Sequence, residues 1–312
     1  MANVYTCTMN LAIDLFIETN TLKPNVVNRT LDDDIQANGK GVNVSLILKK
    51  LHTDSTALGF SGGFTGKYIE TFLHENEIAT NFITVSGNTR INVFTQVLQE
   101  KNEYKLVNKG PEISQEQIDA LLNVIKRIET GAFLCVSGSL PQGIDERILV
   151  EISKIANEKQ FHLILDSSYQ SVLDCLNYQP YLLKPNEEEL ASWFGKKEIS
   201  LDESPLYLDR LIALGAQRVL LSFGSQGCIY ADKSTLLYGN APKGEVVNTA
   251  CAGDTLLGTF IHGLIAKKSL ETCLRKSIAA GSSTAFRKGL TDFSDSETLE
   301  KQIVITPLER KN

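Results

Sequence analysis

Residues 161–194, FHLILDSSYQSVLDCLNYQPYLLKPNEEELASWF, contain the pattern that decides the fold. Short apolar runs at Phe161–Leu165 and Tyr181–Leu183 predict buried strands, and the segment between them has a helical pattern. Similar runs at Phe133–Val136 and Arg218–Ser222 continue the alternation on both sides. The sequence therefore predicts an α/β fold, with a mostly parallel central sheet and helices on both faces. Ligands of such sheets bind where the strands end and loops enter helices.

Two regions depart from this alternation, from about residue 11 to 36 and from 89 to 108. The second contains the run RINVFTQV at residues 90–97, in which apolar and polar side chains alternate as in a strand with one buried face. Both regions can join one small β-sheet that stands apart from the main body as a lid. We therefore expect a single domain over residues 1–312 with a small β-sheet lid.

Composition excludes several functional classes. The chain has 312 residues, of which 42% are hydrophobic and 22% charged, and a net charge of −6. The absence of a basic surplus argues against nucleic acid as a partner. No run of 18 apolar residues and no secretory signal pattern occurs, which predicts no membrane partner and a cytoplasmic location. A phosphorylated substrate would need a local cluster of positive groups, because the molecule as a whole repels anions.

The strongest motif is NTACAGDT at residues 248–255. The apolar residues that follow it at helical spacing are Leu256, Leu257, Phe260, Ile261, Leu264 and Ile265. A loop of small residues thus enters a helix whose first N–H groups and positive dipole end can hold an anion. Asp254 beside that anion suits a general base for phosphoryl transfer. An aspartate that only complements the helix dipole is the alternative interpretation.

A second motif, KPNEEE at residues 184–189, follows a predicted strand and opens another helix. Asn186 and Glu189 have the spacing of a capping box, which is a purely structural role. The same oxygen atoms are suited to organise hydrated Mg²⁺ near nucleotide phosphates, because magnesium keeps waters and takes few direct carboxylates. The spacing alone favours the cap.

A third motif, NGKGVN at residues 38–43, also leads into a helix. Its glycines allow close approach of the backbone to a ligand, and Lys40 and Asn43 add donors for hydroxyl or phosphate groups. A simple helix-entry turn explains the same residues equally well. The chain contains no GxxxxGK[ST] sequence, so this loop is not a P-loop.

Further candidates lie in the predicted lid and at strand ends. Arg29 and Arg90 belong to the lid regions, where a guanidinium can bind phosphate in bidentate fashion or simply face solvent. Ser139 follows the strand at 133–136, either as a donor or as part of a turn. The run SFGSQG at residues 222–227 also follows a strand and can border a nucleotide.

Taken in order, the motifs NGKGVN, TRIN, GSLP, KPNEEE, SFGSQG and NTACAGD resemble the phosphofructokinase-B branch of the ribokinase-like family. The resemblance covers nearly the whole chain. It implies a ribokinase-like sheet with a small β lid, the latter often used to form a homodimer. It also implies a small-molecule sugar phosphate and ATP as substrates, with Mg²⁺ as cofactor.

The resemblance assigns a role to each candidate residue. Asp254 matches the base that takes the proton of the acceptor hydroxyl, and the N–H groups of Ala252, Gly253 and Asp254 match the anion hole for the γ-phosphate. Positions that hold sugar hydroxyls match Asp14, Gly39 and Asn43. Positions around the substrate phosphate match Lys40, Arg90, Ser139 and Arg29. Positions that arrange Mg²⁺ and the nucleotide phosphates match Lys184, Asn186 and Glu189. Positions of the adenine-nucleotide groove match Ser222, Gly224, Gly227, Thr249 and Ser282.

The identity of the sugar rests on finer details. Val27-Asn28-Arg29 and the GFSGGFTG run at 59–66 look most like bacterial 1-phosphofructokinases, which convert fructose 1-phosphate to fructose 1,6-bisphosphate. A tagatose-6-phosphate kinase is the alternative, followed by a 6-phosphofructokinase. Three residues depart from the family pattern on the sugar side: Asn38 in place of a glycine, Leu11 in place of a proline, and Phe94 where a lysine is common.

Two other functional classes fit the residues less well. A nucleoside or an unphosphorylated sugar carries no negative charge that could pair with Lys40 and Arg90, so these residues argue against a kinase of such substrates. A regulatory sugar-phosphate sensor has no use for a base in its anion hole, and Asp254 therefore argues against it.

Overall fold

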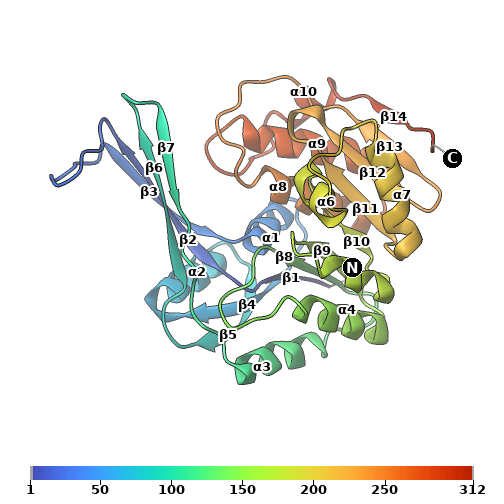
Figure 1. Cartoon of the computed structure of the whole chain (residues 1–312), viewed down its shortest axis with the longest axis horizontal. Helices are drawn as coiled ribbons and strands as arrows, with labels where there is room; N and C mark the ends of the chain where they lie inside the picture. The colour runs from blue at the N-terminus through green and yellow to red at the C-terminus, as the bar shows by residue number, and fades with distance from the viewer. Residues whose placement is uncertain (1–2, 311–312) are drawn as a thin grey trace.

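The computed structural model describes residues 3–310, and it consists of one large sheet, a small sheet and the helices around them (Figure 1). The strands are β1 (Val4–Thr8), β2 (Ala12–Thr19), β3 (Asp32–Asn38), β4 (Thr56–Gly62), β5 (Ala79–Val85), β6 (Arg90–Val97), β7 (Asn102–Leu106), β8 (Phe133–Ser137), β9 (His162–Asp166), β10 (Leu182–Leu183), β11 (Arg218–Ser222), β12 (Cys228–Asp232), β13 (Leu236–Gly239) and β14 (Ile305–Pro307). The helices are α1 (Lys40–Lys50), α2 (Gly63–Glu75), α3 (Gln115–Ile125), α4 (Ile148–Lys159), α5 (Val172–Cys175), α6 (Glu187–Trp193), α7 (Ser204–Leu214), α8 (Ala252–Ile265), α9 (Leu270–Ala285) and α10 (Ser296–Glu300), with 3-10 turns η1 (Leu176–Tyr178) and η2 (Gly224–Gln226).

The large sheet has ten strands in the order β14-β13-β12-β11-β10-β9-β8-β1-β4-β5. All pairs from β5 to β11 are parallel, and the three pairs from β11 to β14 are antiparallel. The predicted mostly parallel sheet is therefore confirmed. The four strands predicted from apolar runs are β8, β9, β10 and β11, and β10 is shorter than its apolar run because it contains only Leu182 and Leu183.

Helices cover both faces of the large sheet because successive strand residues point to opposite sides. On β8, Leu134 and Val136 join the core formed with α3, α4, α6 and α7. Phe133 and Cys135, which alternate with them, join the core formed with α1, α8 and α9. Burial on both faces explains why this strand is a continuous apolar run and why its position could be predicted.

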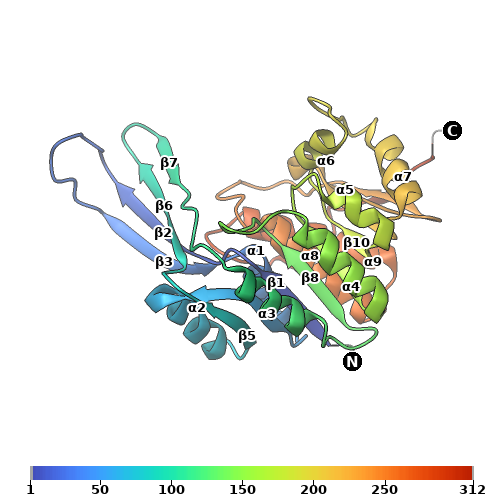
Figure 2. The same cartoon turned by 60° about the horizontal axis from the view of Figure 1, so that its bottom comes forward.

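The small sheet projects away from the body of the molecule, as two views show (Figures 1 and 2). It has four strands in the order β3-β2-β6-β7, with β2 and β6 parallel and the outer pairs antiparallel. At its base, Leu11, Ile13 and Ala37 pack into a core shared with α1 and α2. Further out, Phe16 stacks on Phe94 with ring centroids 5.1 Å apart. The sheet is thus fixed at one end and solvated at the other.

The described residues contain neither a membrane-spanning helix nor a disulfide bond. Among the helices of residues 3–310, none has the length and apolar character needed to cross a bilayer. All six cysteines are free thiols, and five of them are buried as small apolar side chains.

Candidate active site

A cavity of about 390 Å³ lies where the carboxyl ends of β1, β8 and β9 meet the base of the small sheet and the start of α1. Its lining residues are Thr8, Asn10, Ala12, Asp14, Asn38, Gly39, Lys40, Arg90, Asn92, Gly138, Ser139, Ser167, Ser168 and Glu189. Six of these were predicted from the sequence: Asp14, Gly39, Lys40, Arg90, Ser139 and Glu189. The fold therefore gathers motifs from distant parts of the chain around one opening.

A line of polar side chains runs from the small sheet to α8. Asp14 on β2 accepts hydrogen bonds from the Asn92 amide at 2.8 Å and from the Asn38 amide. The Asn38 carbonyl oxygen accepts from Asn43 Nδ2 at 2.9 Å, and the same Asn43 nitrogen donates to Asp254 Oδ2 at 2.8 Å. Burial raises the pKa of Asp14 above its ordinary value. Asp14 and Asp254 are thus connected through two asparagines.

Arg90 occupies the other side of the cavity. Its guanidinium donates to the backbone oxygens of Asn108 and Asn10 at 3.0 and 3.1 Å, and to Ser139 Oγ at 3.4 Å. Its Nε atom is buried without a hydrogen-bond partner, and no carboxylate within residues 3–310 lies at ion-pair distance. Burial lowers the pKa of Arg90. The negative charge of Asp14 acts on Arg90 from a distance, but the described chain places no carboxylate in direct contact with the guanidinium.

Two lysines share one buried carboxylate at the floor of the site. Asp166 Oδ1, at the end of β9, lies 3.2 Å from Lys40 Nζ and 3.1 Å from Lys184 Nζ. The Asp166 side chain has no exposed surface, and its Oδ2 atom has no partner among the described residues. Burial alone would raise the pKa of Asp166, but the charges of Lys184 and Lys40 outweigh burial and lower it. Asp166 thus holds two cations at fixed positions.

The NTACAGDT motif forms the turn that starts α8. Cys251 adopts a left-handed conformation with φ 63°, and the helix begins at Ala252. The Ala252 N–H donates to the Thr249 oxygen at 3.3 Å, whereas the N–H groups of Gly253 and Asp254 have no acceptor within the described chain. Only two of the three predicted donors are therefore free for an anion, and Ala252 is not one of them.

Lys184 completes this anion site. A Cβ atom on Gly253 would lie 3.4 Å from Lys184 Nζ, so the glycine leaves the ammonium group directly beside the helix start. The Lys184 side chain is only 5% exposed. The N-terminus of the 14-residue helix α8, with its two free N–H groups, thus lies beside a buried ammonium group. Together these groups can bind an anion.

Asp254 lies in the first turn of α8 and is buried. Burial, aided by the negative charge of Asp166, raises the pKa of Asp254 to about 6. The charges of Lys40 and Lys184 and the hydrogen bond from Asn43 act in the opposite direction. A carboxyl group that titrates near 6 is ionised at neutral pH and is a better proton acceptor than an ordinary aspartate.

The KPNEEE motif forms the capping box that its spacing predicts. Asn186 Oδ1 accepts from the Glu189 N–H at 2.7 Å, and Glu189 Oε2 accepts from the Asn186 N–H at 3.0 Å. Glu189 also lines the cavity, and its charge acts on Lys40. The cap therefore does not exhaust the carboxylate. Within residues 3–310 no three acidic, histidine or cysteine side chains gather to hold a metal ion directly, so these oxygens fit only a hydrated Mg²⁺ ion contacted through water.

The residues predicted for the nucleotide groove lie around the start of α8 and the end of β11. They are Ser222, Gly224, Gly227, Thr249 and Ser282. Ser222 bridges to Asn186 of the KPNEEE motif through a backbone pair. Thr249 accepts the Ala252 N–H, and Gly281, adjacent to Ser282, packs so closely that a Cβ atom would lie 3.0 Å from the Ala252 oxygen. Thr249 and Ser282 thus lie at the start of α8, Ser222 lies beside the KPNEEE motif, and the role of all five positions in binding a nucleotide stays a prediction.

Arg29 is not brought to the cavity of its own chain. It lies in the connection between β2 and β3, where its carbonyl oxygen accepts from the Thr19 hydroxyl at 3.2 Å. Asp14 and Thr19 stand at opposite ends of the projecting part of β2, about 17 Å apart along an extended strand. Arg29 therefore does not line the cavity of its own chain, because the strand carries it to the far end of the small sheet, and its contact with a substrate phosphate stays a prediction.

Sequence reasoning missed three residues of the site. Asn10 donates to Ser139 Oγ at 3.2 Å, Asn92 holds Asp14, and Asp166 holds the two lysines. Asn92 belongs to the TRIN motif, and Asp166 directly follows a predicted buried strand. A carboxylate at the carboxyl end of an apolar strand was the signal that could have identified Asp166.

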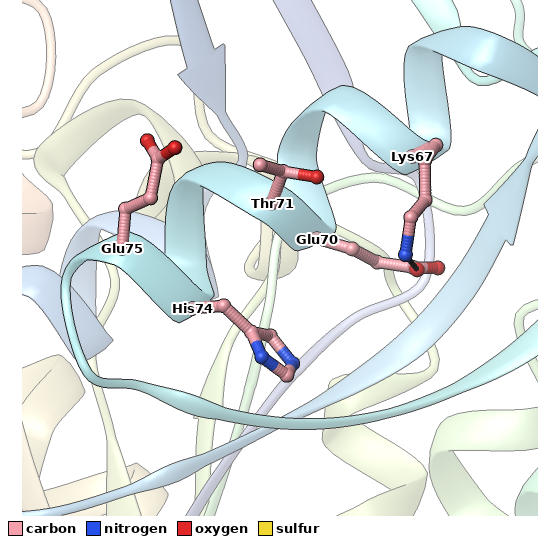
Figure 3. Close-up of a pocket in the computed structure, with 5 residues that line it drawn as sticks. All are labelled: Lys67, Glu70, Thr71, His74 and Glu75. Atoms are coloured by element: carbon pink, nitrogen blue, oxygen red, sulfur yellow. Dashed lines mark hydrogen bonds and ion pairs between the residues drawn. The ribbon is translucent and has the colours of Figure 1, made fainter.

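A second hollow, of about 330 Å³, lies on the outer face of α2. Figure 3 shows that its lining residues, Lys67, Glu70, Thr71, His74 and Glu75, all project from this one helix. Lys67 and Glu70 pair with each other at 3.3 Å, as neighbouring turns of an exposed helix commonly do. Nothing in this hollow resembles the converging groups of the first cavity.

Comparison with known proteins identifies the family. The model of the pfkB family carbohydrate kinases matches residues 6–297. The chain belongs to the pfkB family of carbohydrate kinases. A D-tagatose-1-phosphate kinase of Bacillus licheniformis is 49% identical over 98% of this chain and 100% of that protein. A 1-phosphofructokinase of Bacillus subtilis is 33% identical, again over 98% of this chain and all of that protein.

Solved structures that are similar to this pfkB-family chain have the same fold. A phosphofructokinase described as putative from Staphylococcus aureus has a TM-score of 0.87 at 35% identity, covering 99% of this chain and 100% of its own. Phosphofructokinase-2 from Escherichia coli with fructose-6-phosphate has a TM-score of 0.88 at 26% identity, covering 96% and 99%. The predicted family and fold are confirmed, and the protein is a ketohexose-phosphate kinase of a family that uses ATP.

Proposed function

We propose that this kinase transfers the γ-phosphate of ATP to the 6-hydroxyl group of a ketohexose 1-phosphate, with tagatose 1-phosphate preferred over fructose 1-phosphate. Relatives named for both sugars support the position of the phosphate, and the 49% identical relative supports tagatose. Tagatose 1-phosphate was not among the sugars that the sequence suggested. Fructose 1-phosphate, the sugar expected from the sequence, becomes the second candidate.

Arg90 is the observation that carries the proposal of a phosphorylated sugar. Its guanidinium lies at the cavity beside Ser139, and no carboxylate of the described chain forms a direct ion pair with it, although the charge of Asp14 acts on it from a distance. A dianionic phosphate gives this cation a bidentate partner and satisfies its unpaired Nε atom. An unphosphorylated sugar would leave a partly buried charge without a counterion, which is costly. Arg90, Ser139 and Lys40 therefore bind the substrate phosphate in this proposal.

Asp254 is the general base. Its carboxylate accepts the proton of the 6-hydroxyl group as that oxygen bonds to the γ-phosphorus, and the bond between the γ-phosphorus and its bridging oxygen breaks to release ADP. The free N–H groups of Gly253 and Asp254 and the Lys184 ammonium stabilise the negative charge on the transferring group. Asp14, Gly39 and Asn43 orient the sugar hydroxyls.

Asn186 and Glu189 would hold Mg²⁺ through water molecules, and the ion would supply charge neutralisation of the nucleotide phosphates. Lys184 lies between these residues and the start of α8 and orients the same phosphates. The proposed adenine-nucleotide groove consists of Ser222, Gly224, Gly227, Thr249 and Ser282. The cytoplasm, where ATP is abundant, remains the expected location.

The small sheet is proposed to act as the lid and to form a homodimer with a second copy. Ile35, Leu15, Val93 and Leu106 form one row across its four strands, because they are partners in register. Ile35 and Leu106 are 50% and 63% exposed. Asp14, one residue from Leu15, points to the opposite face. A second lid covering this apolar row would bury it, and Arg29 would then lie near another chain.

The test is ADP release with ATP and Mg²⁺ against tagatose 1-phosphate, fructose 1-phosphate, tagatose 6-phosphate, fructose 6-phosphate and free fructose. We expect the highest kcat/KM with tagatose 1-phosphate and the next with fructose 1-phosphate. A preference for either 6-phosphate, or equal use of free fructose, would contradict the proposal. Sedimentation of the same preparation measures the proposed dimer, and a monomer at micromolar concentration would refute the lid interface.

A further inference from the structure

Asn38 joins the sugar side of the cavity to the catalytic base. It lines the cavity at the end of β3, immediately before the loop that enters α1. Its side-chain oxygen Oδ1 accepts from the Gly39 N–H at 2.6 Å and from Asn43 Nδ2 at 2.9 Å, and these two hydrogen bonds occupy both lone pairs. Its amide nitrogen donates to Asp14, and its second N–H has no acceptor within residues 3–310. One donor is thus held in a fixed orientation with nothing to bind.

The order of contacts along the cavity indicates which sugar atom meets that donor. In the proposed function Asp254 receives the acceptor 6-hydroxyl proton and Arg90 binds the phosphate on C1. Arg90, Asn38 and Asp14 line the cavity, whereas Asp254 lies behind it and is joined to Asn38 through Asn43. Between them the side chains follow in the order Asn43, Asn38 and Asp14. Along a ketohexose, C4 lies closer to C6 than C3 does. The hydroxyl on C4 therefore faces Asn38, and the hydroxyl on C3 faces Asp14.

Tagatose and fructose differ only in the configuration at C4. We propose that Asn38 is a specificity-determining residue, whose free amide N–H donates to the C4 hydroxyl in the tagatose configuration. This inference rests on the proposed function, because it requires a ketohexose 1-phosphate bound with C6 at Asp254. The neighbouring contacts hold the amide in place, so that little side-chain freedom is lost when the sugar binds.

The experiment compares kcat/KM for tagatose 1-phosphate and fructose 1-phosphate in the wild type and in Asn38→Ala and Asn38→Gly. Loss of one well-placed hydrogen bond lowers the tagatose-to-fructose ratio by about tenfold in both variants. Because both sugars are assayed with one preparation, the ratio does not depend on the fraction of folded protein. Asn123→Ala, at an exposed position of α3, is the matched control and should leave the ratio unchanged.

Other outcomes separate this inference from the function on which it rests. Equal losses with both sugars would show that Asn38 only supports Asp14 and Asn43, and would overturn the inference alone. A rise in the ratio would overturn it as well, because the amide would then select the fructose configuration. A wild-type enzyme that phosphorylates neither sugar would overturn the proposed function and the inference together.

Discussion

The charge of Asp166 sets the pH range in which Asp254 can act as a base, and Asp166→Asn tests this directly. Asp166 is the largest charged contributor to the raised pKa of Asp254, after burial. Removing its charge while keeping its size leaves the positive charges of Lys40 and Lys184 to stabilise the Asp254 carboxylate. We therefore expect the pKa of Asp254 to fall in the variant and the acid limb of the activity profile to move to lower pH.

The pKa of about 6 gives the size of the effect in the wild type. A general base must be ionised, so activity is lost as pH falls through 6. One unit below that value about one molecule in eleven carries the ionised base, and kcat/KM is roughly tenfold below its plateau. The assay measures kcat/KM at subsaturating ATP and sugar phosphate from pH 4.5 to 8. In the variant, activity at pH 5 relative to its own plateau should exceed the wild-type fraction.

The comparison is made with one substrate because sugar phosphates also titrate near pH 6. That ionisation is the same for both proteins, and it cancels when their profiles are compared. The variant should also unfold at a lower denaturant concentration, since it leaves the buried ammonium group of Lys184 without its partner, at a cost of roughly 3–5 kcal/mol. Lys40 adds little to this cost, because its side chain is 38% exposed. Identical acid limbs in the two folded proteins would refute the proposed coupling between Asp166 and Asp254.

Three further predictions follow from the site and the sheet. Asp254→Asn should lower kcat by about 10²–10⁴-fold with sugar-phosphate binding retained in calorimetry, and unchanged turnover would exclude Asp254 as the base. Arg90→Ala should raise KM for ketohexose phosphates roughly 10- to 100-fold but not KM for the unphosphorylated sugar, and an equal rise for both would place the phosphate elsewhere. Gly59→Ala should lower the free energy of unfolding by about 3 kcal/mol in urea titration, because the φ of +142° is strained and the new Cβ atom would lie 2.0 Å from the Thr8 oxygen; a change below about 0.5 kcal/mol would mean that the strand pair adjusts freely.

The central fold was predictable because its strands are buried on both faces. The run Phe133–Val136 is apolar throughout and became β8, and Arg218–Ser222 matches β11. Such runs show no alternation of polar and apolar residues, because their apolar side chains enter one or the other of the two cores. At the end of the large sheet, β12 has the same buried apolar pattern, but its antiparallel direction and that of β13 follow from hairpin connections that composition does not specify. β14 joins this edge only after α8, α9 and α10.

The site was predictable where a local motif also creates the functional group. Asp254 lies in the first turn of α8 and Lys40 is the first residue of α1, so the turn and the loop that start these helices place both residues. Asp166 lies in none of the motifs, and the TRIN motif drew attention to Arg90 rather than to Asn92, because the roles of Asp166 and Asn92 depend on partners that lie far away in the sequence. Arg29 shows a different limit of sequence reasoning, since its residue type suits phosphate but the length of β2 carries it away from the cavity of its own chain. Its contact with a substrate phosphate stays a prediction.

The loop at the start of α1 requires glycines at Gly39 and Gly41 for a packing reason that could not be predicted from the sequence. They were expected to admit a ligand, yet a Cβ atom on Gly39 would lie 2.7 Å from Thr8 Cγ2 and one on Gly41 2.6 Å from Thr8 Oγ1. The loop therefore lies directly against the end of β1. This contact fixes where α1 begins, and with it the position of Asn43.

The same close packing links the lid to the chemistry. Asp14 belongs to the small sheet, Asn38 to its junction with α1, Asn43 to α1 and Asp254 to α8, and each contacts the next. A shift of the small sheet relative to the body must therefore displace Asn38 or break its hydrogen bond to Asp14. Because Asp254 is buried and its Oδ2 atom is held by Asn43, such a shift reorients the base as well as the sugar. If the small sheet acts as the proposed lid, its closure on the correct sugar would align the acceptor hydroxyl and its base in one step. A sugar that holds the lid open would then lower kcat as well as raise KM.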